Sequence, residues 1–206
     1  MKMAGFEKKA GEFLEEVSSL LKKNRGFAFW ETLEAAEKLL EKMPSKKLGK
    51  VEKNVVIKGK VFVCKGAVIK SGTRIEGNAF IGKGSVIGPN AFLRKAVIIG
   101  ENCHVGQSEV KHSVFLDHSN APHFNYVGDS VIGENVNLGA GTKIANLRHD
   151  NKSVKVKING QEVDSGKRKL GALVCSGTKT GVNSSINCGA IVAPNTKILP
   201  NEFFKK

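Results

Sequence analysis

The sequence lacks the features that mark small metal-binding, secreted or membrane proteins. Its four cysteines, Cys64, Cys103, Cys175 and Cys188, form no CxxC pair, which argues against zinc ribbons and thioredoxin-type redox sites. No apolar run approaches the roughly 18 residues of a membrane span, and the charged N-terminus does not resemble a secretory signal. Aromatic residues make up 6% of the chain and hydrophobic residues 40%. We therefore expect a cytoplasmic protein with an aliphatic core, no membrane partner and buried, reduced cysteines.

Acidic residues are also scarce. The chain has 33 lysines and arginines against 19 aspartates and glutamates, which gives a formal net charge of +14. Such an excess attracts phosphate groups. The lysines are scattered and the aromatic residues are not interleaved with them, so the pattern matches no recognised nucleic-acid motif. We therefore expect no nucleic-acid partner, and a phosphorylated small molecule fits the charge equally well.

The chain does contain a six-residue repeat. Neither the helical period of 3.6 nor the strand period of 2.0 produces this spacing, which is typical of a parallel β-helix with three short sides and about 18 residues per coil. The position four residues after each repeated aliphatic is mostly small, which leaves room for the large side chain. We predict an all-β fold of stacked coils. The repeated aliphatic residues are Val51, Ile57, Val63, Ile69, Ile75, Ile81, Ile87, Leu93, Ile99 and Val105.

The repeat is interrupted after Val105. It resumes at Tyr126, and the separation of these two residues along the chain is not a multiple of six. We predict that residues 111–125 leave the β-helix as a loop, with Glu109 in the last small inward position. An unpaired carboxylate in that position would be costly, so the pattern ends where polar chemistry begins.

A second interruption spans residues 150–169. Alternating apolar residues lead to Asn159-Gly160, a type I′ hairpin signal. We predict a basic β-arm there, which either packs on a neighbouring subunit or is a solvated decoration. After it, the repeat is expected to continue more loosely at Leu170, Ser176, Val182, Cys188 and Pro194.

Residues 1–48 follow a helical period instead. One apolar stripe begins at Phe6 and is expected to stop at Asn24-Arg25-Gly26, and a second runs from Leu33 to Met43, just before Pro44. We predict a helical segment that caps the open first coil, with pairing to another chain as the alternative. The β-helix domain is then expected over residues 49–206.

The residues around the first interruption resemble a known family. The stretch SEVKHSVF…APHFNYVGDSVIGENVNLGAGTKIANLRHD is similar to the acetyltransferase domain of the bifunctional glucosamine-1-phosphate N-acetyltransferase/N-acetylglucosamine-1-phosphate uridylyltransferase, in its archaeal sugar-1-phosphate nucleotidylyltransferase form. The resemblance covers residues 54–198 and is most specific between Glu109 and Asp150. It implies a left-handed parallel β-helix of hexapeptide repeats and a homotrimer with sites at the subunit interfaces.

The same resemblance implies an acyltransferase of UDP-N-acetylglucosamine biosynthesis. Its co-substrate would be acetyl-CoA and its acceptor an aminosugar 1-phosphate, with glucosamine-1-phosphate first, and the acetyltransferase site would hold no metal. We expect this chain to lack the nucleotidyltransferase domain of the family, so a separate nucleotidyltransferase is an open partner.

Site residues follow from the resemblance one position at a time. His123 matches the general base that takes a proton from the sugar's 2-ammonium group, a task suited to histidine near neutral pH. Arg94 and Lys111 are separated by almost one full coil, so the repeat also predicts that they stack as a two-cation clamp for a phosphate. The expected acceptor-binding residues are Arg94, Lys111, Tyr126, Asn137 and Lys152, and the expected acetyl-CoA residues are Ala140, Asn146, Leu147 and, as a loose match, Thr178.

Two other functions remain open. The spacing of His118 and His123 also occurs in zinc-dependent hexapeptide-repeat hydratases, but residues 82–87, two coils earlier, contain no side chain that could complete the metal site. The second alternative is a non-catalytic hexapeptide-repeat subunit that supports a separate sugar nucleotidyltransferase.

Overall fold

The computed structural model describes residues 3–22 and 28–205. The predicted end of the first helix, at Asn24-Arg25-Gly26, lies outside the described residues. Two helices, α1 (Met3–Lys22) and α2 (Phe29–Glu41), precede a series of short strands. The strands are β1 (Lys46–Lys47), β2 (Lys50–Val51), β3 (Val56–Lys58), β4 (Val61–Val63), β5 (Val68–Ile69), β6 (Arg74–Ile81), β7 (Val86–Ile87), β8 (Phe92–Ile99), β9 (His104–Phe115), β10 (Asn120–Gly128), β11 (Val131–Ile132), β12 (Lys143–Ile144), β13 (Lys155–Ile158), β14 (Gln161–Asp164), β15 (Leu173–Val174), β16 (Lys179–Thr180), β17 (Ser185–Ile186), β18 (Ile191–Val192), β19 (Lys197–Ile198) and β20 (Phe203–Phe204).

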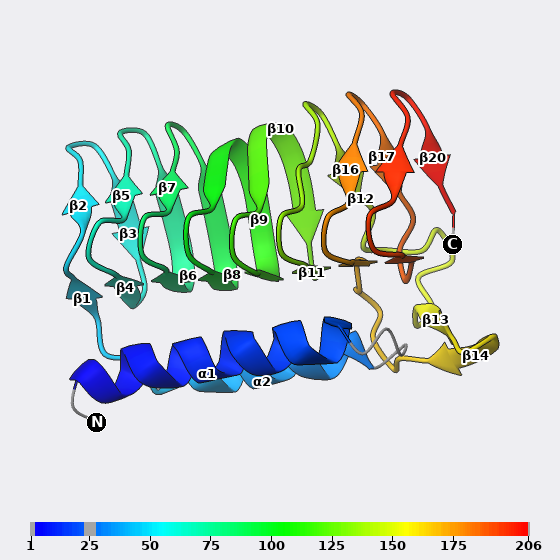
Figure 1. Ribbon diagram of the computed structural model, residues 1–206, viewed down its shortest axis with the longest axis horizontal. Coiled ribbons are helices and arrows are strands. Elements are labelled where there is room, and N and C mark those ends of the chain that lie inside the picture. The colour runs from blue at the N-terminus through cyan, green and yellow to red at the C-terminus, as the bar shows by residue number, and fades with distance from the viewer. Residues whose placement is uncertain (1–2, 23–27, 206) are drawn as a thin grey trace.

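The strands form three parallel columns, which are the three sides of a solenoid (Figure 1). The first side contains β2, β5, β7, β16 and β19 with the beginnings of β9 and β10. The second contains β3, β12, β17 and β20 with parts of β6, β8, β9 and β10. The third contains β1, β4, β11, β15 and β18 with the ends of β6, β8 and β9. The predicted parallel β-helix is confirmed.

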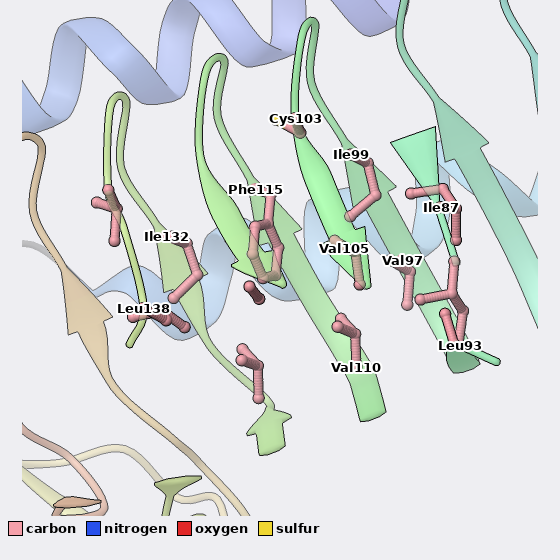
Figure 2. Close-up of a cluster of buried hydrophobic side chains, with 14 of the residues drawn as sticks. Ile87, Leu93, Val97, Ile99, Cys103, Val105, Val110, Phe115, Ile132 and Leu138 are labelled. Carbon is pink, nitrogen blue, oxygen red and sulfur yellow. The ribbon is translucent and has the colours of Figure 1, made fainter. Parts of the chain in front are cut away.

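The core is the aliphatic column predicted from the repeat. Val51, Ile69, Ile87 and Val105 are parallel partners in successive coils of the first side. Figure 2 shows how such inward side chains stack between successive coils, with Phe115 as an aromatic among aliphatic neighbours. All four cysteines are buried. Because the core is shared between coils, each coil is stabilised by its neighbours.

The predicted loop over residues 111–125 is wrong. Residues 111–115 end β9 and residues 120–125 begin β10, with a short turn between them, and the two strands pair in parallel from Asn120 opposite His104 to Gly128 opposite Lys111. The change of phase is taken up in the corners, because at three turns the step between successive inward positions is five residues rather than six. Those turns run from Val105 to Val110, from Val110 to Phe115 and from Val127 to Ile132.

Two consequences follow for the polar residues at this interruption. On the second side, Val127, and not Tyr126, is the inward residue of β10, and it is fully buried. Glu109 is opposite Tyr126 on the outer surface, where it is partly exposed. The predicted inward carboxylate is therefore also wrong.

In the later repeat, the inward residues lie two positions away from the predicted ones. The buried inward residues are Val174, Thr180, Ile186, Val192 and Ile198, each six residues after the last. Val182 of the predicted series is 49% exposed.

The second interruption does form a hairpin. Strands β13 and β14 pair antiparallel, and Asn159 and Gly160 at the turn have positive φ angles of 50° and 84°, as a type I′ turn requires. Val154 and Val156 are buried in a cluster that includes Leu170 of the same chain. The arm therefore packs on its own solenoid, and contact with a neighbouring subunit stays a prediction.

The two helices lie along the third side of the solenoid from its first coils to about β11, and the β13–β14 hairpin lies beyond their end (Figure 1). The predicted cap on the first coil is therefore wrong. Outward side chains of the third side are apolar, and the ring centroids of Phe6 and Phe62 are 5.7 Å apart. Burying each such side chain contributes roughly 1.5–3 kcal/mol. The outward apolar residues are Phe62, Phe80, Ile98, Val114, Val131 and Leu173.

Candidate active site

His123 lies in the corner between the first and second sides. Its strand, β10, contributes Ala121 to the core on the first side and Val127 on the second. The backbone N–H of His123 donates a hydrogen bond to Asn125 Oδ1 at 3.1 Å, and its carbonyl accepts one from the Gly141 N–H at 2.9 Å. The residue itself is exposed. The backbone is thus fixed while the imidazole faces outward on an open edge.

Asn125 holds this corner together. It is 3% exposed, its backbone N–H donates to Ser108 Oγ at 3.0 Å, and its Nδ2 donates to the Gly139 carbonyl at 2.7 Å. One residue thus ties together three consecutive coils at His123. The sequence analysis missed it, although a carboxamide four residues after the inward Ala121, where the repeat favours a small residue, is a detectable signal.

Arg94 and Lys111 stack as predicted. They are parallel partners in adjacent coils of the second side, in β8 and β9. Arg94 Nε donates to Glu109 Oε1 at 2.6 Å, and this hydrogen bond raises the pKa of the Arg94 guanidinium. The Glu109 carboxylate is therefore ion-paired with Arg94. Tyr126, its neighbour in strand register, lies beside it in the next coil. The role of the two cations in binding a phosphate stays a prediction.

Lys111 is joined to a buried aspartate that the sequence analysis did not select. Its Nζ lies 2.7 Å and 2.6 Å from the two carboxylate oxygens of Asp129. Asp129 also accepts from Asn146 Nδ2 at 2.6 Å and lies 3.0 Å from His112 Nδ1. Burial alone would raise the pKa of the Asp129 carboxyl, but the hydrogen bonds from His112 and Lys111 outweigh it and the pKa is lowered.

Tyr126 is tied to the same cluster. Asn146 Nδ2 donates to Tyr126 Oη at 3.0 Å, so the Asn146 amide nitrogen faces both Tyr126 and Asp129. Burial, and then the charge of Glu109, raise the pKa of the Tyr126 phenol. The phenol therefore stays protonated near neutral pH and can donate its own hydrogen to a ligand.

Three further predicted residues lie on the surface. Asn137 is exposed on the first side, where it bridges Asn120 and Lys179 of the neighbouring coils. Ala140 is partly exposed in the same corner as His123. Lys152 is exposed beside Asp150, to whose Oδ1 its N–H donates at 3.2 Å.

The two remaining acetyl-CoA candidates have different outcomes. Leu147 is 40% exposed and lines a hollow of about 520 Å³ together with basic side chains that include Arg148 and Lys155. Thr178 is 0% exposed, and its hydroxyl donates inward to the Ala193 carbonyl at 3.3 Å. A ligand on the surface cannot touch it, so its assignment to acetyl-CoA is wrong. Thr178 was only a loose match in the resemblance, and its side chain occupies a small inward position of the solenoid.

Five of the predicted residues lie on two adjacent sides of the solenoid or in the corner between them. Arg94, Lys111 and Tyr126 lie on the second side, Asn137 lies on the first, and His123 lies in the corner between them. Neither of these sides is covered by the helices, which occupy the third side. An exposed imidazole can take a proton from a ligand bound at this corner, and the cations of the second side can bind an anionic group.

Neither a metal cluster nor a membrane-spanning helix is found in the part of the chain that the structure describes. Within residues 3–22 and 28–205, no group of three or more histidine, cysteine or acidic side chains is arranged to hold a metal ion. Neither helix in this part of the chain is long and apolar enough to span a membrane.

The fold and the edge site define a hexapeptide-repeat β-solenoid that carries a polar, histidine-containing corner. A family model described as the GMPPB C-terminal domain matches residues 75–202, which is more than half of the chain. The chain therefore belongs to this family.

Curated relatives support the resemblance found in the sequence. The bifunctional sugar-1-phosphate nucleotidylyltransferase/acetyltransferase of Sulfurisphaera tokodaii is 47% identical over 172 residues, which cover 78% of this chain and 43% of the relative. The bifunctional protein GlmU of Methanococcus maripaludis strain C7 is 55% identical over 173 residues, which cover 84% of this chain and 42% of the relative. This chain thus spans less than half the length of these relatives. The predicted family resemblance is confirmed.

A solved structure overlaps less closely. The acetyltransferase domain of PglB from Neisseria gonorrhoeae is 13% identical, with a TM-score of 0.43, over 75% of this chain and 56% of that chain.

Proposed function

We propose that this chain transfers the acetyl group of acetyl-CoA to the amino group of an aminosugar 1-phosphate. Glucosamine-1-phosphate is the first candidate acceptor and the step would lead toward UDP-N-acetylglucosamine in the cytoplasm. The observation that carries the proposal is the exposed imidazole of His123, fixed by its backbone in a corner whose flanking sides contain the predicted acceptor residues. The relatives named as acetyltransferases support it.

His123 is the proposed general base. It takes a proton from the 2-ammonium group of the sugar, and the freed amine attacks the thioester carbonyl. A C–N bond forms, the C–S bond breaks, and the departing CoA sulfur takes up a proton. A positioned base contributes typically 10²- to 10⁴-fold to such a rate, and holding the two reactants together contributes further.

The other residues bind and orient the two substrates in this proposal. Arg94, Lys111 and Lys152 hold the 1-phosphate, while Tyr126 and Asn137 contact the sugar. The acetyl-CoA would lie along Ala140, Asn146 and Leu147. Tyr126 supports this arrangement because its phenol is protonated and half-buried beside Arg94.

A homotrimer would complete the site. The predicted residues are divided between two open sides, while the helices pack on the third side. We propose that the first side of one subunit faces the second side of the next, so that Asn137 and Arg94 of different subunits enclose one acceptor. A separate nucleotidyltransferase would supply the neighbouring step of the pathway.

The direct test is a CoA-thiol release assay with acetyl-CoA and a panel of sugar phosphates. We expect release with glucosamine-1-phosphate, weaker release with galactosamine-1-phosphate, and none with glucose-1-phosphate, which has a hydroxyl in place of the amine. Equal release with glucose-1-phosphate would contradict amine acetylation. No release with any aminosugar phosphate, together with co-purification of a nucleotidyltransferase, would favour a non-catalytic subunit.

A further inference from the structure

Helix α2 touches the candidate acceptor site through a chain of polar contacts. We infer that Glu37 and His112 are positioning residues that hold Asp129, and that Asp129 in turn fixes Lys111 and Asn146 for an anionic acceptor. The inference rests on the proposed function for the identity of the acceptor. It adds a helix that lies outside the repeat to the machinery of the site.

The contacts are continuous from the helix to the cation. Glu37 Oε2 lies 3.3 Å from His112 Nε2, within ion-pair distance but without hydrogen-bond geometry, and His112 Nδ1 lies 3.0 Å from Asp129 Oδ1. Asp129 then contacts Lys111 Nζ through both oxygens. Glu37 Oε2 is also 3.4 Å from Lys95 Nζ, so the outer end of the chain of contacts is anchored.

Burial makes the inner part of this network rigid. The side chains of Lys111, His112 and Asp129 are 12%, 11% and 4% exposed, while that of Glu37 is 37% exposed. The two oxygens of Asp129 are shared by three donor groups, so the carboxylate cannot turn without breaking a buried hydrogen bond. An ammonium has three donor hydrogens, and this arrangement leaves Lys111 able to direct one of them to a ligand.

The backbone explains why His112 reaches the helix. Lys95, His112 and Asp129 have positive φ angles of 66°, 47° and 51° in successive coils, at the corner between the second and third sides. Residues other than glycine adopt this conformation infrequently. Here it turns the chain at the corner that α2 covers, and a cavity of about 250 Å³ beside it is lined by Glu37, Lys111, His112 and Asp129 among others.

Charge and positioning predict opposite effects of removing Glu37. By charge alone, loss of a nearby carboxylate would strengthen the binding of an anion at Lys111, since charges about 10 Å apart still interact at moderate ionic strength. If Glu37 positions the network, its loss lets His112 and Asp129 shift, and anion binding becomes weaker. The direction in which anion affinity changes therefore distinguishes a charge effect from a positioning role of Glu37.

A matched control lies on the same helix. Glu34 is similarly exposed, at 41%, and lines the same cavity, but its ion pair is with Lys167 and it acts on His112 through charge alone. We would measure the affinity of wild-type chain, Glu37→Gln and Glu34→Gln for inorganic phosphate and for glucosamine-1-phosphate by calorimetry. We expect Glu37→Gln to bind both about threefold or more weakly, a modest coupling for residues in one network, and Glu34→Gln to bind as well as wild type or slightly better.

A second variant tests the same network without changing a residue of helix α2. His112→Asn is compatible with the left-handed backbone, and its amide can still donate to Asp129, but it cannot reach Glu37. We expect the same loss as in Glu37→Gln, and no further loss in the double variant. Equal phosphate affinity of Glu37→Gln and Glu34→Gln would overturn the inference, as would the absence of phosphate binding by the wild-type chain.

The acetyl-transfer assay separates this inference from the proposed function. If the wild-type chain binds phosphate through this network but releases no CoA, the proposed function fails and the positioning role stands. If it releases CoA, Glu37→Gln should raise KM for the sugar phosphate with little change in KM for acetyl-CoA. A purely structural role would lower activity toward both substrates alike.

Discussion

At the scale of single residues, Asp129 shows how this chain keeps a charge buried. Its carboxylate is 3% exposed and receives hydrogen bonds from Lys111, His112 and Asn146. These hydrogen bonds hold its pKa below the ordinary value despite burial. Breaking such a network by removing one partner is costly, because the remaining charge stays buried without compensation.

Asp129→Asn should therefore destabilise the chain in a pH-dependent way. A carboxyl whose folded pKa is lowered contributes stability above its unfolded pKa, about 3.9, and that contribution is lost as the pH falls toward the folded pKa. We expect the free energy of unfolding to drop by about 3–5 kcal/mol at pH 7. Urea titrations at pH 7 and pH 3 would show this gap narrowing at the lower pH.

The exposed Glu16 provides the control for this prediction. Glu16→Gln should change the stability by no more than about 0.5 kcal/mol at either pH. A gap between wild type and Asp129→Asn that is the same at pH 3 as at pH 7 would show that the ionised carboxylate is not the source of the stability.

At the scale of elements, the third side of the solenoid binds helix α1 through aromatic contacts. The rings of Phe62 and Phe80 stack with centroids 5.8 Å apart, and Phe6 of α1 lies 6.1 Å from Phe80. These residues form a core outside the solenoid, because a side whose outward residues are apolar must be covered.

Phe80→Ala should uncouple the helices from the solenoid. Phe80 is 4% exposed, and truncation of a buried phenylalanine costs about 3–5 kcal/mol. Phe203, which is 51% exposed, is the matched control, and Phe203→Ala should cost much less. Urea unfolding followed by far-ultraviolet circular dichroism would measure both, and equal losses would contradict the packing described here.

The repeat predicted the solenoid but not how the helices meet it. Phe62, Phe80 and Ile98 recur once per coil just before an inward aliphatic, a signal for one covered side that the sequence analysis did not use. Because a strict six-residue spacing was assumed, the five-residue turns were interpreted as a loop that leaves the solenoid. Spacing alone cannot distinguish a loop that leaves the solenoid from a corner that has lost a residue.

The site could be predicted in part for a similar reason. His123, Lys111 and Tyr126 could be predicted from the resemblance, because they lie in its most specific stretch. The network of Glu37 and His112 depends on how α2 docks against a corner several coils further along the chain. Such a contact leaves no local pattern in the sequence.

At the scale of the whole molecule, the three sides have different tasks. The third side is closed by the helices, while the first and second meet at the edge that carries His123. The excess of positive charge suits a phosphorylated acceptor, since it raises the local concentration of anions at the surface. The proposed homotrimer uses both open sides and places the edge between neighbouring subunits.

The most direct test of this account compares CoA release by wild-type chain and by His123→Ala, with saturating acetyl-CoA and glucosamine-1-phosphate. Light scattering and circular dichroism would first establish that both chains have the same assembly and fold. We predict that kcat falls by about 10²-fold or more, as expected for loss of a positioned general base. An undiminished rate in a correctly assembled His123→Ala chain would remove His123 from the mechanism and contradict the proposed site.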